Sequence, residues 1–438
     1  MRFFPPLTRK DERQMKRHGI RYISVLVLTA ILIEGCISSN NEQKVRKEEI
    51  SIPQTLTYCT WEDERGYTGK LVDAFMAEHP SISIDIQYID DDMTEQKAAE
   101  LLSSNDIDII GLKNINDVLY LAEQEKIVDL TDWIAASGID VAYYGNMYGS
   151  ISLNGHYWCL PTRKTSWVLA YNKKIFKQEK LEEPGQMTWD EFAETAKLLT
   201  KGEGANKQWG CYFVNWIYNF MGAQKKNYLY DDDLTYIQKS LEFFNRIYFE
   251  DMSSMMPEEM EREDWIKTFE KGNVAMMPMG EWFVGMIMAD EKEGASEIDW
   301  DIAPMPVPEG VKGGTTWGTY QLAAISSKCE KSERMEAAFE FMEFLCGEDG
   351  AQIYAANGMI PAYVDQKIEE IYCDAVRGRH TDVFFDAYQV QENPAYDGYE
   401  ILEDILEEAI SFLDGKQDID TVMKNFEDKR QQFFKRQQ

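Results

Sequence analysis

Flat aromatic side chains stand next to carboxylates or an arginine at several places in this sequence. An indole ring can pack on the apolar C–H face of a pyranose, while carboxylates, amides and guanidinium groups can bond to the hydroxyl groups at its edge. A groove that combines both kinds of side chain therefore suits a sugar. Each tryptophan taken alone could equally fill a hydrophobic core. The candidate ligand-binding residues are Trp61, Glu62, Asp63, Arg163, Trp216, Glu281, Trp282, Trp317 and Tyr320.

The residue patterns of common enzymes are missing from the sequence. The four histidines, at positions 18, 79, 156 and 380, are isolated, and there is no Gly-x-Ser-x-Gly turn or phosphate-binding Gly-x-x-x-x-Gly-Lys loop. The acidic runs 90–92 and 231–233 lack the glycine and the distal glutamate of a calcium loop. Spacing alone does not single out the carboxylate pair of a glycosidase among 77 acidic residues. We therefore expect no enzyme, metal or cofactor; a surface glycoside hydrolase or lyase is the alternative from another class.

Length and charge limit the possible architecture and partners. A chain of 438 residues is long for one hydrophobic core and long enough for two lobes. Its formal net charge of −32 argues against nucleic acid and against an anionic lipid surface, because both require a basic face on the protein. The acidic balance permits a cationic ligand such as a polyamine, and that alternative stays open.

The first 35 residues have the order of an export signal. A basic segment from Arg9 to Arg21 precedes an apolar run, 22–33, that is too short to span a bilayer permanently, and Gly35 and Cys36 follow it. This order resembles a lipobox, which implies that Cys36 is lipidated and that residues 1–35 are removed; an uncleaved anchor is the alternative. The polar segment 36–52 then reads as a tether. The remaining six cysteines lack metal-site spacing, and we expect mostly free thiols, although pairing stays open.

Alternating strand and helix patterns follow the tether. Strands are predicted at 56–61, 82–88 and 107–110, with helices at 71–77 and 94–102 between them and another at 119–130. This βαβαβ order implies a parallel sheet, in which ligands bind at the carboxyl ends of the strands. Trp61, Glu62 and Asp63 directly follow the first strand, so the order predicts that they lie beside a site.

Two later stretches have a distinctive order of turns, strands and caps. In 154–192, Asn154-Gly155 forms a hairpin turn, Pro161 ends that hairpin, 167–171 is a buried strand, and Thr188 with Glu191 forms a capping box. In 269–282, a helix ends at a glycine, a strand rich in Ala and Met follows, and Gly-Glu-Trp opens the next helix. Residues 300–308 contain three prolines and predict a stiff crossing. Beyond them, 337–345, 401–413 and 419–434 are predicted helices.

These stretches together resemble the signature of family 1 bacterial extracellular solute-binding proteins, the lipoproteins that serve sugar ABC importers. The resemblance implies an α/β, two-lobe periplasmic-binding-protein-like fold of type II, with lobes joined by three crossings. It places 53–163 and 307–358 in lobe 1, and 164–306 and 359–438 in lobe 2. It also implies a carbohydrate ligand, an oligosaccharide by preference, between the lobes, and ABC permease subunits as partners. The family's Gly-x-Trp motif falls on Trp282, which makes that residue the first candidate for stacking on a sugar.

The same resemblance predicts the cellular setting. The protein is expected to be a monomer outside the cytoplasm, lipid-anchored to the cell membrane, or on the periplasmic side in a Gram-negative cell.

Overall fold

The computed structural model describes residues 53–90, 94–104, 106–214, 216–256, 265–330, 332–395 and 401–436. The predicted signal sequence, Cys36 and the tether lie outside these residues, as does most of the acidic run 90–92. The described residues belong to one compact unit, Ile50–Gln438. No helix within them combines the length and apolar character needed to cross a membrane.

The first sheet contains the predicted βαβαβ unit. Its strand order is β2-β1-β3-β12-β6, with β1 parallel to β2 and β3, and β12 antiparallel to β3 and β6. The strands are β1 (Gln54–Trp61), β2 (Ile82–Ile89), β3 (Ile109–Leu112), β6 (Leu160–Lys164) and β12 (Tyr320–Ile325). The parallel pairing predicted for the first three strands is confirmed.

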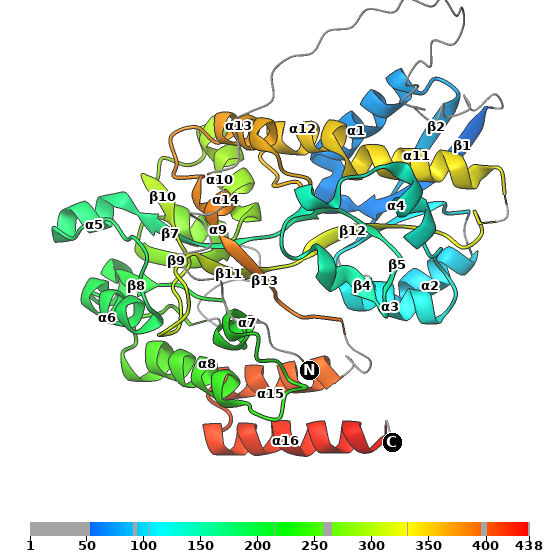
Figure 1. The fold of residues 1–438 in the computed structure, drawn as a ribbon. Coiled ribbons are helices and arrows are strands. Elements are labelled where there is room, and N and C mark those ends of the chain that lie inside the picture. The colour runs from blue at the N-terminus through cyan, green and yellow to red at the C-terminus, as the bar shows by residue number, and fades with distance from the viewer. Residues whose placement is uncertain are drawn as a thin grey trace, which may run out of the picture. The chain divides into compact units, whose positions relative to one another are not determined.

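Helices cover both faces of this sheet; Figure 1 shows α1, α11 and α12 on one face and α2 and α3 on the other. The helices of this region are α1 (Arg65–Glu78), α2 (Glu95–Ser104), α3 (Ile115–Glu123), α4 (Thr131–Ser137), α11 (Arg334–Cys346) and α12 (Glu348–Ala356), and the 3-10 turns are η2 (Glu62–Glu64), η3 (Val141–Tyr144) and η4 (Tyr148–Ile151). The helix predicted at 119–130 is wrong in its bounds. The helix begins four residues earlier, at Ile115, because Asn114 caps it by accepting a hydrogen bond from the Asn116 backbone, and Glu125 at a φ of 53° lies beyond its end.

The short hairpin joins β4 (Ser152–Leu153) to β5 (His156–Tyr157). Asn154 and Gly155 have φ angles of 54° and 85°, the left-handed pair that a tight two-residue turn requires. The hairpin prediction is therefore confirmed.

The second sheet has the order β10-β7-β9-β8. Its strands are β7 (Trp167–Asn172), β8 (Trp209–Cys211), β9 (Val274–Gly280) and β10 (Trp300–Ala303), and β7 is antiparallel to both neighbours. A separate parallel pair joins β11 (Thr315–Gly318) to β13 (Tyr388–Gln391). Every residue of β7 and β9 is buried, which explains why both strands read as continuous apolar runs.

The remaining helices contribute side chains to the second core. They are α5 (Lys173–Glu179), α6 (Trp189–Leu199), α7 (Phe220–Lys225), α8 (Thr235–Asn245), α9 (Trp265–Glu270), α10 (Trp282–Glu293), α13 (Gln366–Ala375), α14 (Val383–Asp386), α15 (Ile401–Leu413) and α16 (Ile419–Arg436), with a 3-10 turn, η5 (Gly204–Asn206), and a π-helical turn, η6 (Arg246–Glu250). Figure 1 shows α15 and α16 beside α8. The capping box that starts α6 is confirmed, because Thr188 accepts from the Glu191 backbone and Glu191 accepts from the Thr188 backbone.

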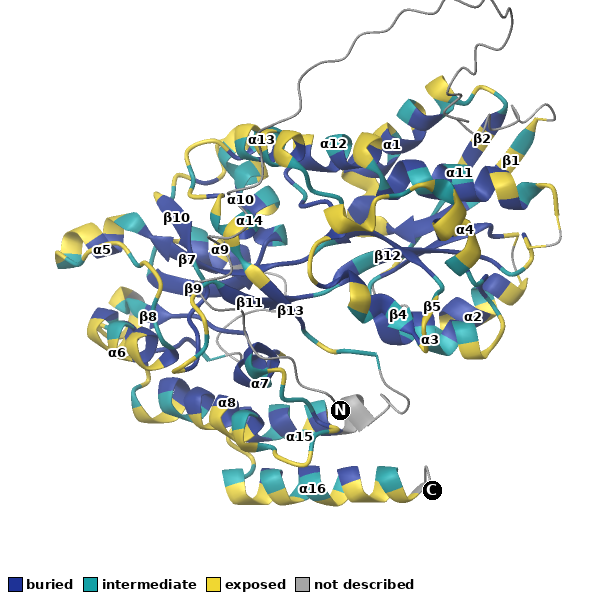
Figure 2. Ribbon diagram, viewed as in Figure 1, coloured by how far each residue is buried: buried dark blue, intermediate teal, exposed yellow. Residues whose placement is uncertain are grey.

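The described residues form two hydrophobic cores, one around each sheet. Figure 2 shows the central strands of both sheets as buried and the edge strand β2 as partly exposed, while the helices alternate between buried and exposed residues. Each of the six described cysteines is a free thiol, and five of them are buried.

The chain passes between the two cores near Thr165 and Thr319. The Thr165 backbone donates to the Thr319 carbonyl at 2.8 Å, and the Thr319 backbone donates to the Thr165 hydroxyl at 2.8 Å. The predicted first-lobe range 307–358 needs correction, because residues 315–318 within it pair with β13 and Trp317 packs in the second core. This crossing therefore lies at about Thr319, not at 307. The third passage runs beside the first, since Lys164 donates to the Ile360 carbonyl at 3.1 Å.

Candidate binding site

A pocket of about 330 Å³ lies where the two sheets approach each other. Strand β1 leads into its acidic residues, β3 ends just before Lys113, and β9 ends just before Glu281. The carboxyl ends of strands from both sheets thus contribute to one site, as expected for α/β folds. The lining residues are Asp63, Glu64, Lys113, Arg163, Thr165, Trp167, Trp216, Ile217, Glu281, Trp282, Thr319, Gln321 and Glu392.

Arg163 is the charged centre of this pocket. Only 8% exposed, it donates to Glu64 of the first sheet at 3.4 Å and to Glu281 of the second at 3.5 Å. It also donates to the Tyr67 hydroxyl, while its Nε has no partner among the described residues. Burial opposes the charge of Arg163, but Tyr67, Glu64 and Glu281 outweigh that effect and raise its pKa. The guanidinium is therefore a fixed cation, and Glu64, Tyr67 and Glu281 use three of its five N–H donors.

Glu281 is fully buried at the start of α10. One carboxylate oxygen accepts from Arg163, and the other accepts from the Ser166 backbone at 3.2 Å. Burial raises the pKa of Glu281 to about 7, although Arg163 and the Ser166 N–H lower it. This carboxyl group therefore changes charge near neutral pH.

Three tryptophans form the aromatic side of the pocket. Trp167 and Trp282 meet edge to face with ring centroids 5.4 Å apart, and Trp216 is 43% exposed. The ring of Trp282 lies against Gly280, where an added Cβ would come within 1.9 Å of it. The glycine of the Gly-Glu-Trp sequence is thus required for the ring to lie across the end of β9.

The structure brings five of the nine sequence-predicted residues to this pocket: Asp63, Arg163, Trp216, Glu281 and Trp282. Asp63 forms an ion pair with Lys113 at 2.9 Å. The other four predicted residues do not line the pocket.

Burial or pairing explains the position of the four residues outside the pocket. Trp61 is 4% exposed beneath the ammonium group of Lys113, and the exposed Glu62 is paired with Arg65 at 2.6 Å. Trp317 is completely buried and stacks on Trp167. Tyr320 is buried in the first core and donates to the Tyr144 carbonyl at 2.6 Å. We therefore correct the predicted set by leaving out Trp61, Glu62, Trp317 and Tyr320.

Sequence reasoning missed several lining residues. Lys113 follows the third predicted strand as Asp63 follows the first. Because ligands bind at the carboxyl ends of parallel strands, Lys113 could have been predicted by the same reasoning as Asp63. Glu392 follows β13, a strand that is not among the elements predicted from the sequence. No local pattern marks Glu392, because its place depends on the pairing of β13 with β11.

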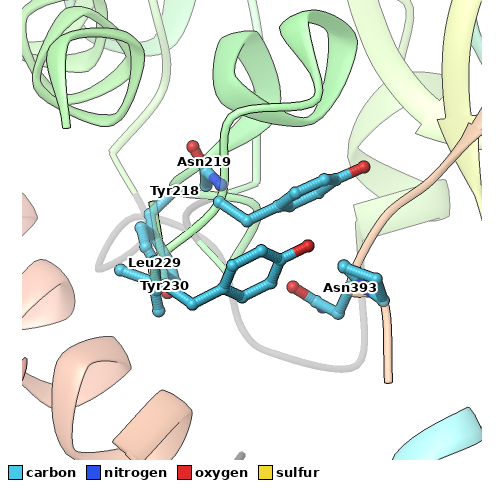
Figure 3. A pocket seen from close by; sticks show the side chains of 7 residues that line it. Tyr218, Asn219, Leu229, Tyr230 and Asn393 are labelled. Atoms are coloured by element: carbon cyan, nitrogen blue, oxygen red, sulfur yellow. The ribbon is translucent and has the colours of Figure 1, made fainter. Parts of the chain in front are cut away.

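A second, narrow pocket is lined by residues that directly follow Ile217 and Glu392 of the first pocket in the sequence. It is lined by Tyr218, Asn219, Tyr228, Leu229, Tyr230, Asn393 and Pro394. Figure 3 shows Tyr218, Asn219, Leu229 and Tyr230 on one side and Asn393 on the other. Tyr228 and Tyr230 stack with centroids 5.7 Å apart, and the Tyr228 hydroxyl donates to the Gln391 carbonyl at 2.7 Å. Residues 216–217 and 392 line the first pocket and 218–219 and 393–394 the second, so the two are adjacent along the chain.

Within the described residues, no group of three or more His, Cys, Asp or Glu side chains is placed to hold a metal ion. The site instead offers ring faces, carboxylates, amides and one buried guanidinium. Such a set can bind a polyhydroxylated ligand through stacking and hydrogen bonds.

Comparison with solved structures finds the same fold in sugar-binding proteins. A sugar transporter protein from Rhizobium etli in an open conformation is 26% identical, with a TM-score of 0.76 over 86% of this chain and 99% of that one. An ABC substrate-binding protein from Listeria monocytogenes in complex with cycloalternan is 21% identical, with a TM-score of 0.74 over 86% and 98%. The sugar-binding protein MalE from Xanthomonas citri is 18% identical, with a TM-score of 0.71 over 87% and 98%. The predicted two-lobe, type II periplasmic-binding-protein-like fold is confirmed.

The family comparison agrees with the fold. No curated protein matches the sequence. The family model described as bacterial extracellular solute-binding protein matches residues 61–352, which is more than half of the chain. This protein belongs to the bacterial extracellular solute-binding proteins.

Proposed function

We propose that this protein binds a carbohydrate of more than one sugar unit in the pocket around Arg163 and delivers it to the permease of an ABC importer. The proposal rests on one observation: aromatic ring faces and planar polar groups line the same cavity. Trp216 and Trp282 offer faces for sugar rings, and Arg163, Gln321 and Glu392 offer groups for hydroxyls. The sugar-binding proteins of the same fold support this assignment.

Neighbours of the same fold support a ligand longer than one ring, because their structures hold cycloalternan and mannotriose. The second pocket lies next along the segments that carry Trp216 and Glu392, but its free volume of about 10 Å³ holds a water molecule and not a sugar ring.

The proposal includes the membrane setting predicted above. Residues 1–35 would direct export, Cys36 would carry the lipid, and 36–52 would tether a monomeric binding domain outside the cytoplasm. The apolar run followed by Gly35 and Cys36 supports this part of the proposal.

A ligand screen by calorimetry tests the proposal. Purified protein lacking residues 1–52 is titrated with monosaccharides, with di- and trisaccharides of several linkages, and with spermidine and putrescine. We expect micromolar or tighter binding of at least one oligosaccharide and weaker binding of its monosaccharide. Binding of a polyamine but no saccharide would contradict the proposal. Release of shorter sugars during incubation with the protein would instead support a glycoside hydrolase or lyase.

A further inference from the structure

In the pocket around Arg163, the acidic side chains outnumber the basic ones. Four carboxyl groups line it, from Asp63, Glu64, Glu281 and Glu392, and two basic side chains, from Lys113 and Arg163. Lys113 is paired with Asp63 at 2.9 Å, and Arg163 is shared by Glu64 at 3.4 Å and Glu281 at 3.5 Å. Among the described residues, no basic side chain forms an ion pair with Glu392. One carboxyl group is therefore left without a counter-charge.

The backbone fixes Glu392 in this position. Glu392 follows β13 directly, and its backbone N–H donates to the Gly318 carbonyl at 2.9 Å. Gly318 itself packs so closely on the first passage between the cores that an added Cβ would come within 2.1 Å of the Thr165 carbonyl oxygen. The strand end that carries Glu392 is thus held tightly against the passage between the cores.

Glu392 is partly buried in a pocket rich in aromatic rings. Burial raises the pKa of Glu392 to about 7. Trp167, Trp216 and Trp282 line the same pocket. An ionised carboxylate in such a place is costly unless a ligand supplies a positive charge, and indole faces attract cations as well.

We propose that the saccharide bound here contains an amino sugar, whose ammonium group pairs with Glu392 among the three tryptophans. The inference rests on the proposed carbohydrate function and narrows its ligand class. Neutral sugars can donate hydroxyl hydrogen bonds to Glu392 but supply no counter-charge, and uronates or sugar phosphates would add a like charge to an acidic pocket. The amine would have to be free, because an N-acetyl group removes the charge.

Matched ligand series test the inference by calorimetry at pH 7. Glucosamine, galactosamine and mannosamine are compared with the corresponding hexoses and N-acetyl derivatives, and β-1,4-linked glucosamine trimers are compared with cellotriose and with N-acetylated trimers. Within at least one series we expect the free amine to bind ten times more tightly, or better, than its neutral analogue. Equal or tighter binding of the neutral sugars would overturn the inference and leave the proposed function standing. Failure of every saccharide to bind would overturn the proposed function itself.

A variant pair assigns the preference to Glu392. Glu392→Gln should lower the preference for the amine over its neutral analogue at least fivefold. The matched control is Glu182→Gln, an exposed residue between α5 and α6, which should leave both affinities unchanged. Glu392→Asp, which retains the charge, should keep part of the preference and also tests the site if the Gln variant fails to fold. A folded Gln variant with the full preference would overturn the inference.

Discussion

Replacing Trp282 with alanine separates a ligand-binding tryptophan from a core tryptophan. The ring is partly buried, lines the pocket and contacts Trp167 edge to face at 5.4 Å. Loss of one stacking face should weaken sugar binding by about 2 kcal/mol, or about thirtyfold. The free energy of unfolding should fall by about 2 kcal/mol, from a lost aromatic pair and some lost apolar burial.

Two matched variants calibrate these numbers. Trp317→Ala removes a completely buried ring and should lower the free energy of unfolding by about 3–5 kcal/mol. Trp133→Ala removes a ring that is 36% exposed on α4 and contacts Phe339 outside the pocket, so sugar affinity should not change. Trp282→Phe should recover part of the lost affinity, because a smaller flat ring remains.

The assays are calorimetric titration with the tightest-binding oligosaccharide and denaturant unfolding of the free protein. Unchanged affinity for Trp282→Ala, together with a loss of stability as large as that of Trp317→Ala, would refute the reasoning. Trp282 would then act as a core residue, and the aromatic side of the site would have to be reassigned to Trp216.

Three further predictions concern pH, closure and processing. Burial raises the pKa of Glu281 from 4.5 to about 7, so its contribution to stability is complete below pH 4.5 and is lost as the pH rises through 7. Between pH 5 and pH 8, the free energy of unfolding of Glu281→Gln should therefore rise on the order of 3 kcal/mol relative to that of the wild type. Denaturant unfolding measures this difference, and a difference that does not change with pH would contradict the prediction. Saturating oligosaccharide should reduce the radius of gyration in small-angle scattering, because residues from both sheets contact one ligand; identical curves would count against closure. Cys36→Ser should abolish lipid attachment, and mass spectrometry that finds residues 1–35 on the mature protein would show the processing prediction to be wrong.

Features that depend on neighbours in the sequence were predicted correctly. The Asn154-Gly155 turn requires left-handed φ angles that these residues tolerate, and the capping box of Thr188 and Glu191 forms within one turn of helix. The first three strands follow from alternating or continuous apolar runs. The polar residues after β1 and β9 were also expected near a site, because the carboxyl ends of such strands face a common cleft.

The tertiary structure alone decided which tryptophans reach the pocket and which carboxylate is left unpaired there. Trp317 is buried because β11 pairs with β13, in the register Trp317↔Val390, and Tyr320 is buried because β12 lies between β3 and β6. The same pairing of β11 with β13 brings Glu392 to the passage between the cores. These contacts join residues far apart in the chain, and the side of a strand that meets solvent is decided by its partner strands and covering helices. A sequence pattern can place an aromatic residue at the end of a strand, but its exposure to a ligand depends on surfaces that only the folded chain brings together.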